Sequence, residues 1–278
     1  MKTIIYGSTD TGRRIYDEVK SSTDVICFVD DNPAMWGGQI AGKEIRSPEE
    51  IKEAEFDEVI IGVLTYHMEV LEKLLSYGVP KQKINELYVN IPTHARIEAL
   101  RNVRWLVDEE NIQGSVAELG VFRGEFAKEI NLLFPDRTLY LFDTFEGFSE
   151  QDTNIEVEKK YASKDKAGYF ANTSEEFVLS QMPHPEKCVI KKGFFPETIY
   201  GIEDTFSFVN LDADLYAPTV AGLDFFYSRL NPGGVIFVHD FFSKAFLGVK
   251  DAVREFCSRE GIPFIPIGDT LSVAIRKI

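Results

Sequence analysis

The stretch Val116-Ala-Glu-Leu-Gly-Val-Phe-Arg-Gly124 sets an acidic residue near the end of a predicted strand and two glycines in the turn behind it. Glycine lets a backbone approach a ligand closely, so this turn between a strand and a helix predicts a binding loop. The spacing Gly120-x-x-x-Gly124 behind Glu118 departs from the Gly-x-Gly-x-x-Gly pattern of dinucleotide sites. A ligand with a cationic amino acid portion fits this loop better, and a plain connecting turn is the alternative.

A second acidic residue, Asp143, ends the next predicted strand in the motif Leu141-Phe-Asp-Thr-Phe-Glu-Gly-Phe148. An acid about 20 residues after a glycine turn is the usual partner of ribose hydroxyls. The alternative is that Asp143 caps the following helix, a common use of aspartate after a strand. The two motifs together favour the binding of a cofactor.

Four further polar residues follow two later predicted strands. Asp212 and Asp214 come after one strand, and His239 and Asp240 after the other. Ligands of an open parallel sheet bind beyond the carboxyl ends of its strands, so these side chains converge if the strands are neighbours. The cluster suits a divalent cation, and because Mg²⁺ prefers oxygen, the imidazole leaves Mn²⁺, iron or an outer role for His239 open. The alternatives are a solvated turn for the aspartates and a structural histidine.

Strands and helices alternate along the chain, which predicts parallel sheets in an α/β fold. The length of 278 residues exceeds the usual single core of about 100–200 residues, and the pattern breaks near Ile91-Pro92. Spaced apolar residues over Thr93–Val107 indicate a linking helix, and Pro263–Ile275 indicates a terminal hairpin with an antiparallel strand. We therefore predict two Rossmann-like domains, residues 1–92 and 114–278, joined by a linking helix at 93–113. The polar segment Gln151–Ser174 is predicted to be a mobile lid.

The composition of the chain limits the classes of molecule that it is expected to bind. A net charge of −15 opposes binding to nucleic acid or to an anionic membrane, and no stretch is long and apolar enough for an integral membrane segment. Three cysteines without paired spacing fit a reducing compartment, so we expect a cytoplasmic protein.

Five ordered motifs together resemble the macrocin O-methyltransferase family over residues 114–278. They are the glycine turn at 116–124, Phe142–Phe148, Gly193-Phe-Phe-Pro-Glu-Thr198, Leu211-Asp-Ala-Asp-Leu-Tyr216 and Gly233-Gly-Val-Ile-Phe-Val-His-Asp240. The resemblance implies a seven-stranded class I methyltransferase sheet, S-adenosylmethionine as methyl donor, a divalent metal (usually magnesium) and a sugar hydroxyl on a natural product as acceptor. A small-molecule or glycan substrate is implied by the same resemblance. Related enzymes often associate, which leaves a homo-oligomer open.

The resemblance also implies roles for individual residues. The cofactor site would comprise Glu118, Gly120, Phe122 and Gly124 around the methionine portion, Asp143 at the ribose, Gly193 and Phe194 near the adenine, and Asp212. Asp212 and Asp240 would hold the metal, and His239 stands where family members commonly have a further aspartate. A metal can lower the proton affinity of a hydroxyl while a carboxylate removes its proton. Asp214 is the candidate general base, and Asp212 is its rival.

The first 92 residues resemble the small Rossmann-like domain of bacterial sugar-modifying enzymes. Gly7 and Gly12 frame a turn after the first strand, and Asp30 and Asp31 end the second, which gives a candidate nucleotide site. The turn lacks the Gly-Lys-Ser/Thr signature of a phosphate loop, so ligand binding and a structural role weigh equally. The leading hypothesis is a metal-assisted sugar O-methyltransferase acting on a glycoconjugate, nucleotide-sugar or polysaccharide precursor. The alternatives are an NAD- or nucleotide-binding oxidoreductase or regulator, and a scaffold with a non-catalytic methyltransferase-like domain.

Overall fold

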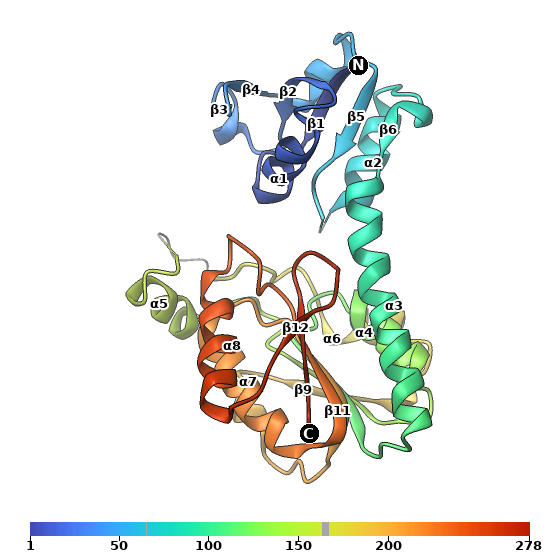
Figure 1. Ribbon diagram of the computed structural model, residues 1–278, viewed down its shortest axis with the longest axis vertical. Coiled ribbons are helices and arrows are strands. Elements are labelled where there is room, and N and C mark those ends of the chain that lie inside the picture. The colour runs from blue at the N-terminus through green and yellow to red at the C-terminus, as the bar shows by residue number, and fades with distance from the viewer. Residues whose placement is uncertain (65, 163–166) are drawn as a thin grey trace. The chain divides into compact units, whose positions relative to one another are not determined.

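The chain folds into two compact units, Met1–His94 and Ala95–Ile278, in a computed structural model that describes residues 1–64, 66–162 and 167–278 (Figure 1). Each unit has its own sheet and its own hydrophobic core. Within the described residues, no helix combines the length and the apolar character needed to cross a membrane.

Unit 1 is built on a six-stranded sheet with the order β3-β4-β2-β1-β5-β6. All of its strand pairs are parallel except the short hairpin of β3 and β4. The strands are β1 (Lys2–Tyr6), β2 (Asp24–Val29), β3 (Gln39–Ile40), β4 (Lys43–Arg46), β5 (Glu58–Ile61) and β6 (Ile84–Asn85), and the helices are α1 (Asp10–Val19) and α2 (His67–Ser76).

Unit 2 is built on a seven-stranded sheet with the order β12-β13-β11-β10-β7-β8-β9. Its strands are β7 (Ser115–Leu119), β8 (Leu139–Asp143), β9 (Cys188–Lys192), β10 (Phe206–Leu211), β11 (Leu230–Val238), β12 (Ile265–Pro266) and β13 (Val273–Arg276). Strand β13 runs antiparallel to both of its neighbours, and the other pairs are parallel. The predicted α/β fold, with a seven-stranded sheet and an antiparallel last strand, is confirmed.

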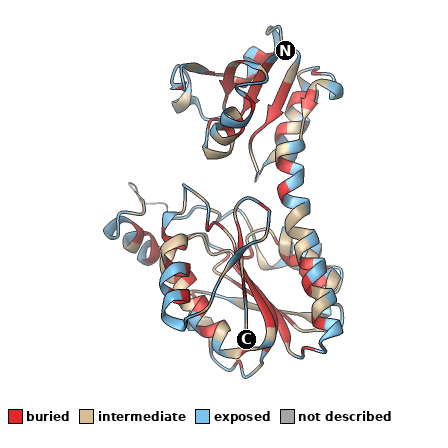
Figure 2. Ribbon diagram, in the orientation of Figure 1, coloured by how far each residue is buried: buried red, intermediate tan, exposed pale blue. Residues whose placement is uncertain are grey.

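Helices cover both faces of this sheet. The helices that follow β7 in the chain are α4 (Glu125–Leu133), α5 (Glu150–Glu158), α6 (Glu175–Gln181), α7 (Tyr216–Arg229) and α8 (Leu247–Glu260). Ala117 and Val209 pack in one cluster with α7 and α8, whereas Val116 and Phe208 pack in a second cluster with α4. Successive residues of a strand point to opposite faces, which explains this division and the buried strands of Figure 2.

Helix α3 spans Leu87–Glu109 and thus crosses the point at which the units divide. Pro92 lies inside this helix, which begins six residues before the predicted linking helix at 93–113. Proline in a helix interior removes one backbone hydrogen bond, and the segment nevertheless stays helical. In unit 2, Leu100, Val103 and Val107 of α3 enter the same core cluster as Val116.

The predicted lid contains helix α5 and ends just before α6 (Glu175–Gln181), and its residues 163–166 lie outside the described part of the chain. Helix α5 is anchored rather than free: Glu156 accepts a hydrogen bond from the backbone N–H of Tyr216 at 2.6 Å. Just after α5, the hydroxyl of Tyr161 donates to Asp251 of α8 at 2.9 Å.

Candidate active site

The polar residues that follow β10 and β11 meet at the carboxyl edge of the sheet. These strands are hydrogen-bonded neighbours, with Leu211 opposite Val238. His239, which comes after Val238, therefore lies beside Asp212, which comes after Leu211. The Nδ1 atom of His239 is 2.9 Å from an oxygen of Asp212 and 2.9 Å from an oxygen of Asp240. The convergence predicted from the strand ends is present in the structure.

The backbone at this edge is strained at several points. Phe122, Phe145, Asp214 and Asp240 all have positive φ values of 47°, 54°, 61° and 59°. They lie in the loops after β7, β8, β10 and β11, so four neighbouring strand ends carry this feature. Left-handed conformations cost a non-glycine residue about 1–3 kcal/mol and cluster at functional sites. The positive φ values are thus found together at the carboxyl edge of the sheet in unit 2.

Opposite charges balance within the cluster. Burial opposes ionisation, but the charges of His239 and Arg96 hold the pKa of Asp212 well below its usual range. Burial lowers the pKa of His239, yet Asp212 and Asp240 outweigh that effect and raise the pKa to about 10. The pKa of Asp240 is lowered chiefly by His239, in spite of burial, and its carboxyl shares a hydrogen bond with Asp214.

Glu118 is enclosed beneath this cluster, with only 2% of its surface exposed. It pairs across the sheet with Asn210, whose amide donates to Glu118 Oε1 at 2.7 Å. Burial, helped by the charge of Asp212, raises the pKa of Glu118 to about 8. The acid in the glycine motif is therefore an interior group, held mainly in its neutral form at pH 7.

Gly120 is required by a close backbone crossing. Its φ is +86°, and a Cβ at this position would lie 2.0 Å from the carbonyl oxygen of Asp212. The glycine thus lets the end of β7 pass directly beside the loop that carries Asp212. Gly124, with φ +78°, is the N-cap residue before α4, and a Cβ there would meet Met182 and Val178 at 3.0 and 3.1 Å.

Asp143, the last residue of the neighbouring strand β8, stabilises the glycine turn after β7 through hydrogen bonds. One of its oxygens accepts the backbone N–H groups of Val121 and Phe122, each at 2.8 Å, and the other accepts that of Phe145 at 2.7 Å. The carboxylate orients the loops after β7 and β8 rather than capping a following helix. Contact with a ribose stays a prediction.

The predicted adenine residues lie one strand further out. Gly193 follows β9, has φ +135°, and donates its backbone N–H to the carbonyl of Asp143 at 2.9 Å. Phe194 is half-buried beside it. The glycine turn, Asp143 and Gly193 therefore follow the adjacent strands β7, β8 and β9 in order along one edge.

Two contributors were missing from the sequence interpretation, namely Arg96 and Asn210. The guanidinium of Arg96 donates through Nη2 to Asn210 Oδ1 at 2.8 Å and to Asp212 Oδ2 at 3.0 Å. Asn210 lies inside the strand β10, and its sequence signal was that of a polar side chain in a mainly apolar strand. Arg96 lies 116 residues before Asp212, so only the packing of α3 brings them together.

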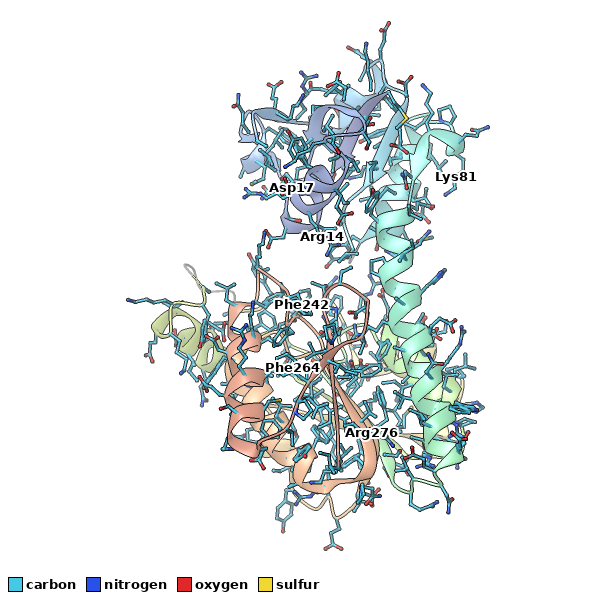
Figure 3. All side chains as sticks on the ribbon, viewed as in Figure 1. Arg14, Asp17, Lys81, Phe242, Phe264 and Arg276 are labelled. Atoms are coloured by element: carbon cyan, nitrogen blue, oxygen red, sulfur yellow. The ribbon has the colours of Figure 1, made fainter. Side chains whose placement is uncertain are left out.

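The loop behind His239 is held by aromatic packing. Phe241 contacts Phe264, with ring centroids 4.8 Å apart, and also Phe242 at 4.9 Å. Phe241 is buried, whereas 44% of Phe242 is exposed (Figure 3 labels Phe242 and Phe264). This packing fixes the segment next to Asp240.

The candidate nucleotide residues of unit 1 serve its own structure. A Cβ on Gly12 would lie 2.0 Å from the carbonyl oxygen of Gly7, so the turn is closed by backbone packing. Asp30 accepts from Ser8 N at 2.9 Å and Ser8 Oγ at 2.5 Å, and Asp31 accepts from Tyr6 Oη at 3.0 Å. Nucleotide binding by these residues stays a prediction.

The cluster also has the donor chemistry of a metal site. Asp212, His239 and Asp240 each offer one ligand atom, and these atoms lie within 4.8 Å of one another. Ligands at right angles around an ion at about 2.1 Å are about 3.0 Å apart, close to the 2.9 Å contacts of His239. Two carboxylates and one imidazole fit Mn²⁺ or another transition metal better than Mg²⁺. The same contacts fit an imidazolium that shares its proton.

Known proteins resemble the two units separately. A family model described as macrocin O-methyltransferase matches residues 86–277, and one described as C2185-like, N-terminal, matches residues 1–85. A Streptomyces olivaceus 8-demethyl-8-(2,3-dimethoxy-alpha-L-rhamnosyl)-tetracenomycin-C 4'-O-methyltransferase is 25% identical over 183 residues, 61% of this chain and 69% of that protein. Demethyldecarbamoylnovobiocin O-methyltransferase of Streptomyces niveus is 26% identical over 60% of this chain and 68% of that protein.

Solved structures share the fold. The O-methyltransferase NovP matches with a TM-score of 0.53 and 23% identity, over 66% of this chain and 79% of that one. The calicheamicin methyltransferase CalS11 matches with a TM-score of 0.54 and 18% identity, over 75% and 84% of the two chains. Because the family model covers the whole of the sheet and site just described, the chain belongs to the macrocin O-methyltransferase family and is an O-methyltransferase.

Proposed function

We propose that unit 2 transfers a methyl group from S-adenosylmethionine to a sugar hydroxyl of a glycosylated natural-product or polysaccharide precursor. The observation that carries this proposal is the shared edge: the glycine turn, Asp143 and Gly193 adjoin the cluster of Asp212 and His239. A donor lying across β7, β8 and β9 would present its sulfonium toward β10. The name of the Streptomyces olivaceus relative, a 4'-O-methyltransferase of a rhamnosyl compound, supports a sugar as acceptor.

Asp214 is the better candidate for the general base. Both oxygens of Asp212 already have partners, His239 on one side and Arg96 on the other. A carboxylate held in this way is a weak proton acceptor, and Asp214, whose own carboxyl shares a hydrogen bond with Asp240, is the other carboxylate in the loop after β10. The acceptor oxygen would form its bond to the methyl carbon as the carbon–sulfur bond breaks, while the hydroxyl proton passes to Asp214.

A divalent cation would be held by Asp212, His239 and Asp240. When bound, such an ion lowers the proton affinity of a coordinated hydroxyl. Because a metal must displace the proton of His239, binding should weaken as the pH falls. Calorimetric titration of the metal-free protein with MnCl₂ and MgCl₂ tests this part, and we expect Mn²⁺ to bind more tightly. His239→Asp should reverse that preference, and an unchanged preference would remove the metal from the proposal.

The transfer itself is tested by mass spectrometry of S-adenosylhomocysteine released in the presence of rhamnosyl acceptors, both nucleotide-activated and attached to an aglycone. Asp212→Asn should lower turnover at least about 100-fold, because it disturbs the cluster's charge balance. Asp224→Asn is the matched control, since Asp224 is exposed and pairs only with Arg259 among the described residues. Failure of the wild-type protein to bind S-adenosylmethionine at millimolar concentration would refute the proposal.

A further inference from the structure

Arg96 is held in an unusual position for a cation. Its side chain is only 12% exposed, and its guanidinium lies over the ring of Phe126, 4.2 Å from the centroid. Nη2 is fixed by Asn210 and Asp212. These contacts come from β10, the loop after it and α4, so the guanidinium is preorganised beside the glycine turn that α4 follows.

The same region contains two buried polar atoms without hydrogen-bond partners among the described residues, Nε of Arg96 and Oε2 of Glu118. Nη1 of Arg96 likewise forms no hydrogen bond with a described residue, and it is not enclosed. A buried polar group left unpaired costs about 1–3 kcal/mol, so such atoms are rarely retained without a use. Arg96 therefore offers a cationic donor to a ligand, while Glu118 in the same cluster is an enclosed acid that is mainly neutral at pH 7.

A ligand that pairs with the remaining guanidinium nitrogens of Arg96 must carry an anion. The α-carboxylate at the methionyl end of S-adenosylmethionine is such an anion. The other cationic side chain of the cluster, His239, is already shared by two carboxylates. Arg96 of α3 is thus a cation of this cluster that still has guanidinium nitrogens available for a ligand.

We propose that Arg96 binds the α-carboxylate of the methyl donor. This inference rests on the proposed function, because it names the residue that selects that donor. A carboxylate bound by a guanidinium forms charge-assisted hydrogen bonds, which are about twice as strong as neutral ones. Arg96 would then discriminate the donor from analogues that lack the carboxylate.

Calorimetric titration with S-adenosylmethionine and with decarboxylated S-adenosylmethionine, which lacks only the α-carboxylate, provides the test. The wild-type protein should bind the complete donor about 10- to 100-fold more tightly than the decarboxylated one. In Arg96→Met this ratio should fall to below about 3, with little change for the decarboxylated donor, and Arg96→Lys should restore part of it. Arg101→Met on the same helix is the control, since Arg101 is exposed and pairs only with Glu98 among the described residues.

Equal weakening of both ligands in Arg96→Met would overturn the inference and leave Arg96 a structural partner of Asp212. Unchanged affinity for both ligands would overturn it as well, with the proposed function intact. If the wild-type protein binds neither ligand, the inference and the proposed function both fail. Because the ratio is measured within each variant, partial loss of folded protein does not imitate the expected result.

Discussion

Glu118 has a different environment in the structure from the one that its sequence motif suggests. In the sequence it is the acid of a glycine motif, whereas in the structure it is enclosed and shares its neighbourhood with Asp212, Arg96, Asn210 and Asp143. An enclosed acid with pKa about 8 holds its proton at neutral pH. One carboxyl oxygen accepts from Asn210, and the other can carry the proton. The neutral form therefore belongs to the stable fold.

The protonation of Glu118 should make stability fall as the pH rises. The unfolded chain releases this proton near the ordinary value of 4.5, while the folded protein keeps it to about 8. Between these values the folded state binds one more proton, so the free energy of unfolding decreases by about 1.4 kcal/mol per pH unit. Glu118→Gln should lack this component, and urea unfolding at pH 5, 6, 7 and 8 measures the difference.

Glu109→Gln is the control for this experiment, because Glu109 is exposed at the end of α3. Its slope with pH should equal that of the wild-type protein. If the free energy of unfolding of Glu118→Gln changes with pH as much as that of the wild-type protein, the folded and unfolded forms hold the Glu118 proton equally. That result would contradict a raised pKa of Glu118 in the folded protein.

At the scale of elements, α5 stabilises a helix that lies far from it in sequence. Helix α7 begins after Leu215, which cannot cap it, and no side-chain cap is formed there. The backbone N–H of Tyr216 is instead accepted by Glu156, 60 residues earlier. A carboxylate at a helix N-terminus also meets the positive end of the helix dipole. Glu156 is 3% exposed, so this cap is shielded from solvent.

Replacing Glu156 should therefore loosen the start of α7. Glu156→Leu removes the acceptor and should cost about 1–2 kcal/mol of stability, as the loss of an N-cap does. Glu156→Gln keeps an acceptor oxygen and should lose less. Hydrogen exchange of the amides in the first turn of α7, together with thermal unfolding, measures both effects. Equal protection in all three proteins would show that the hydrogen bond contributes nothing to α7.

The elements differ in how far their sequences reveal them. The strands of unit 2 were predictable because parallel strands covered on both faces are apolar runs that end in turn residues. The hairpin of β3 and β4 was missed, since its strands are two and four residues long and include Lys43 and Glu44. Neither the cap by Glu156 nor the contact of Arg96 with Asp212 leaves a local pattern, because each joins residues far apart in the chain. The candidate residues at the strand ends could therefore be predicted from the sequence. The buried contacts of Arg96 and Asn210 could not, because they depend on tertiary packing.

At the scale of the molecule, the hydrophobic clusters follow the division into units. Two clusters contain only residues between Ile4 and Val89, and two contain only residues from Leu100 onward. Helix α3 contributes to both sides, with Val89 in a cluster of unit 1 and Leu100 in a cluster of unit 2. Each core is thus complete without the other unit, provided that the correct part of α3 stays attached.

A fragment of residues 91–278 should therefore fold and bind S-adenosylmethionine within about threefold of the full chain. It keeps Arg96 and the core residues of α3, and it places Pro92 in the first turn of the helix, where a missing N–H costs nothing. A fragment of residues 114–278 should fail to fold stably, because it loses Leu100, Val103 and Val107 from the core, each worth roughly 1–3 kcal/mol. Thermal unfolding and calorimetry compare the two fragments with the full chain. Loss of binding in a folded fragment of residues 91–278 would mean that unit 1 supports the donor site.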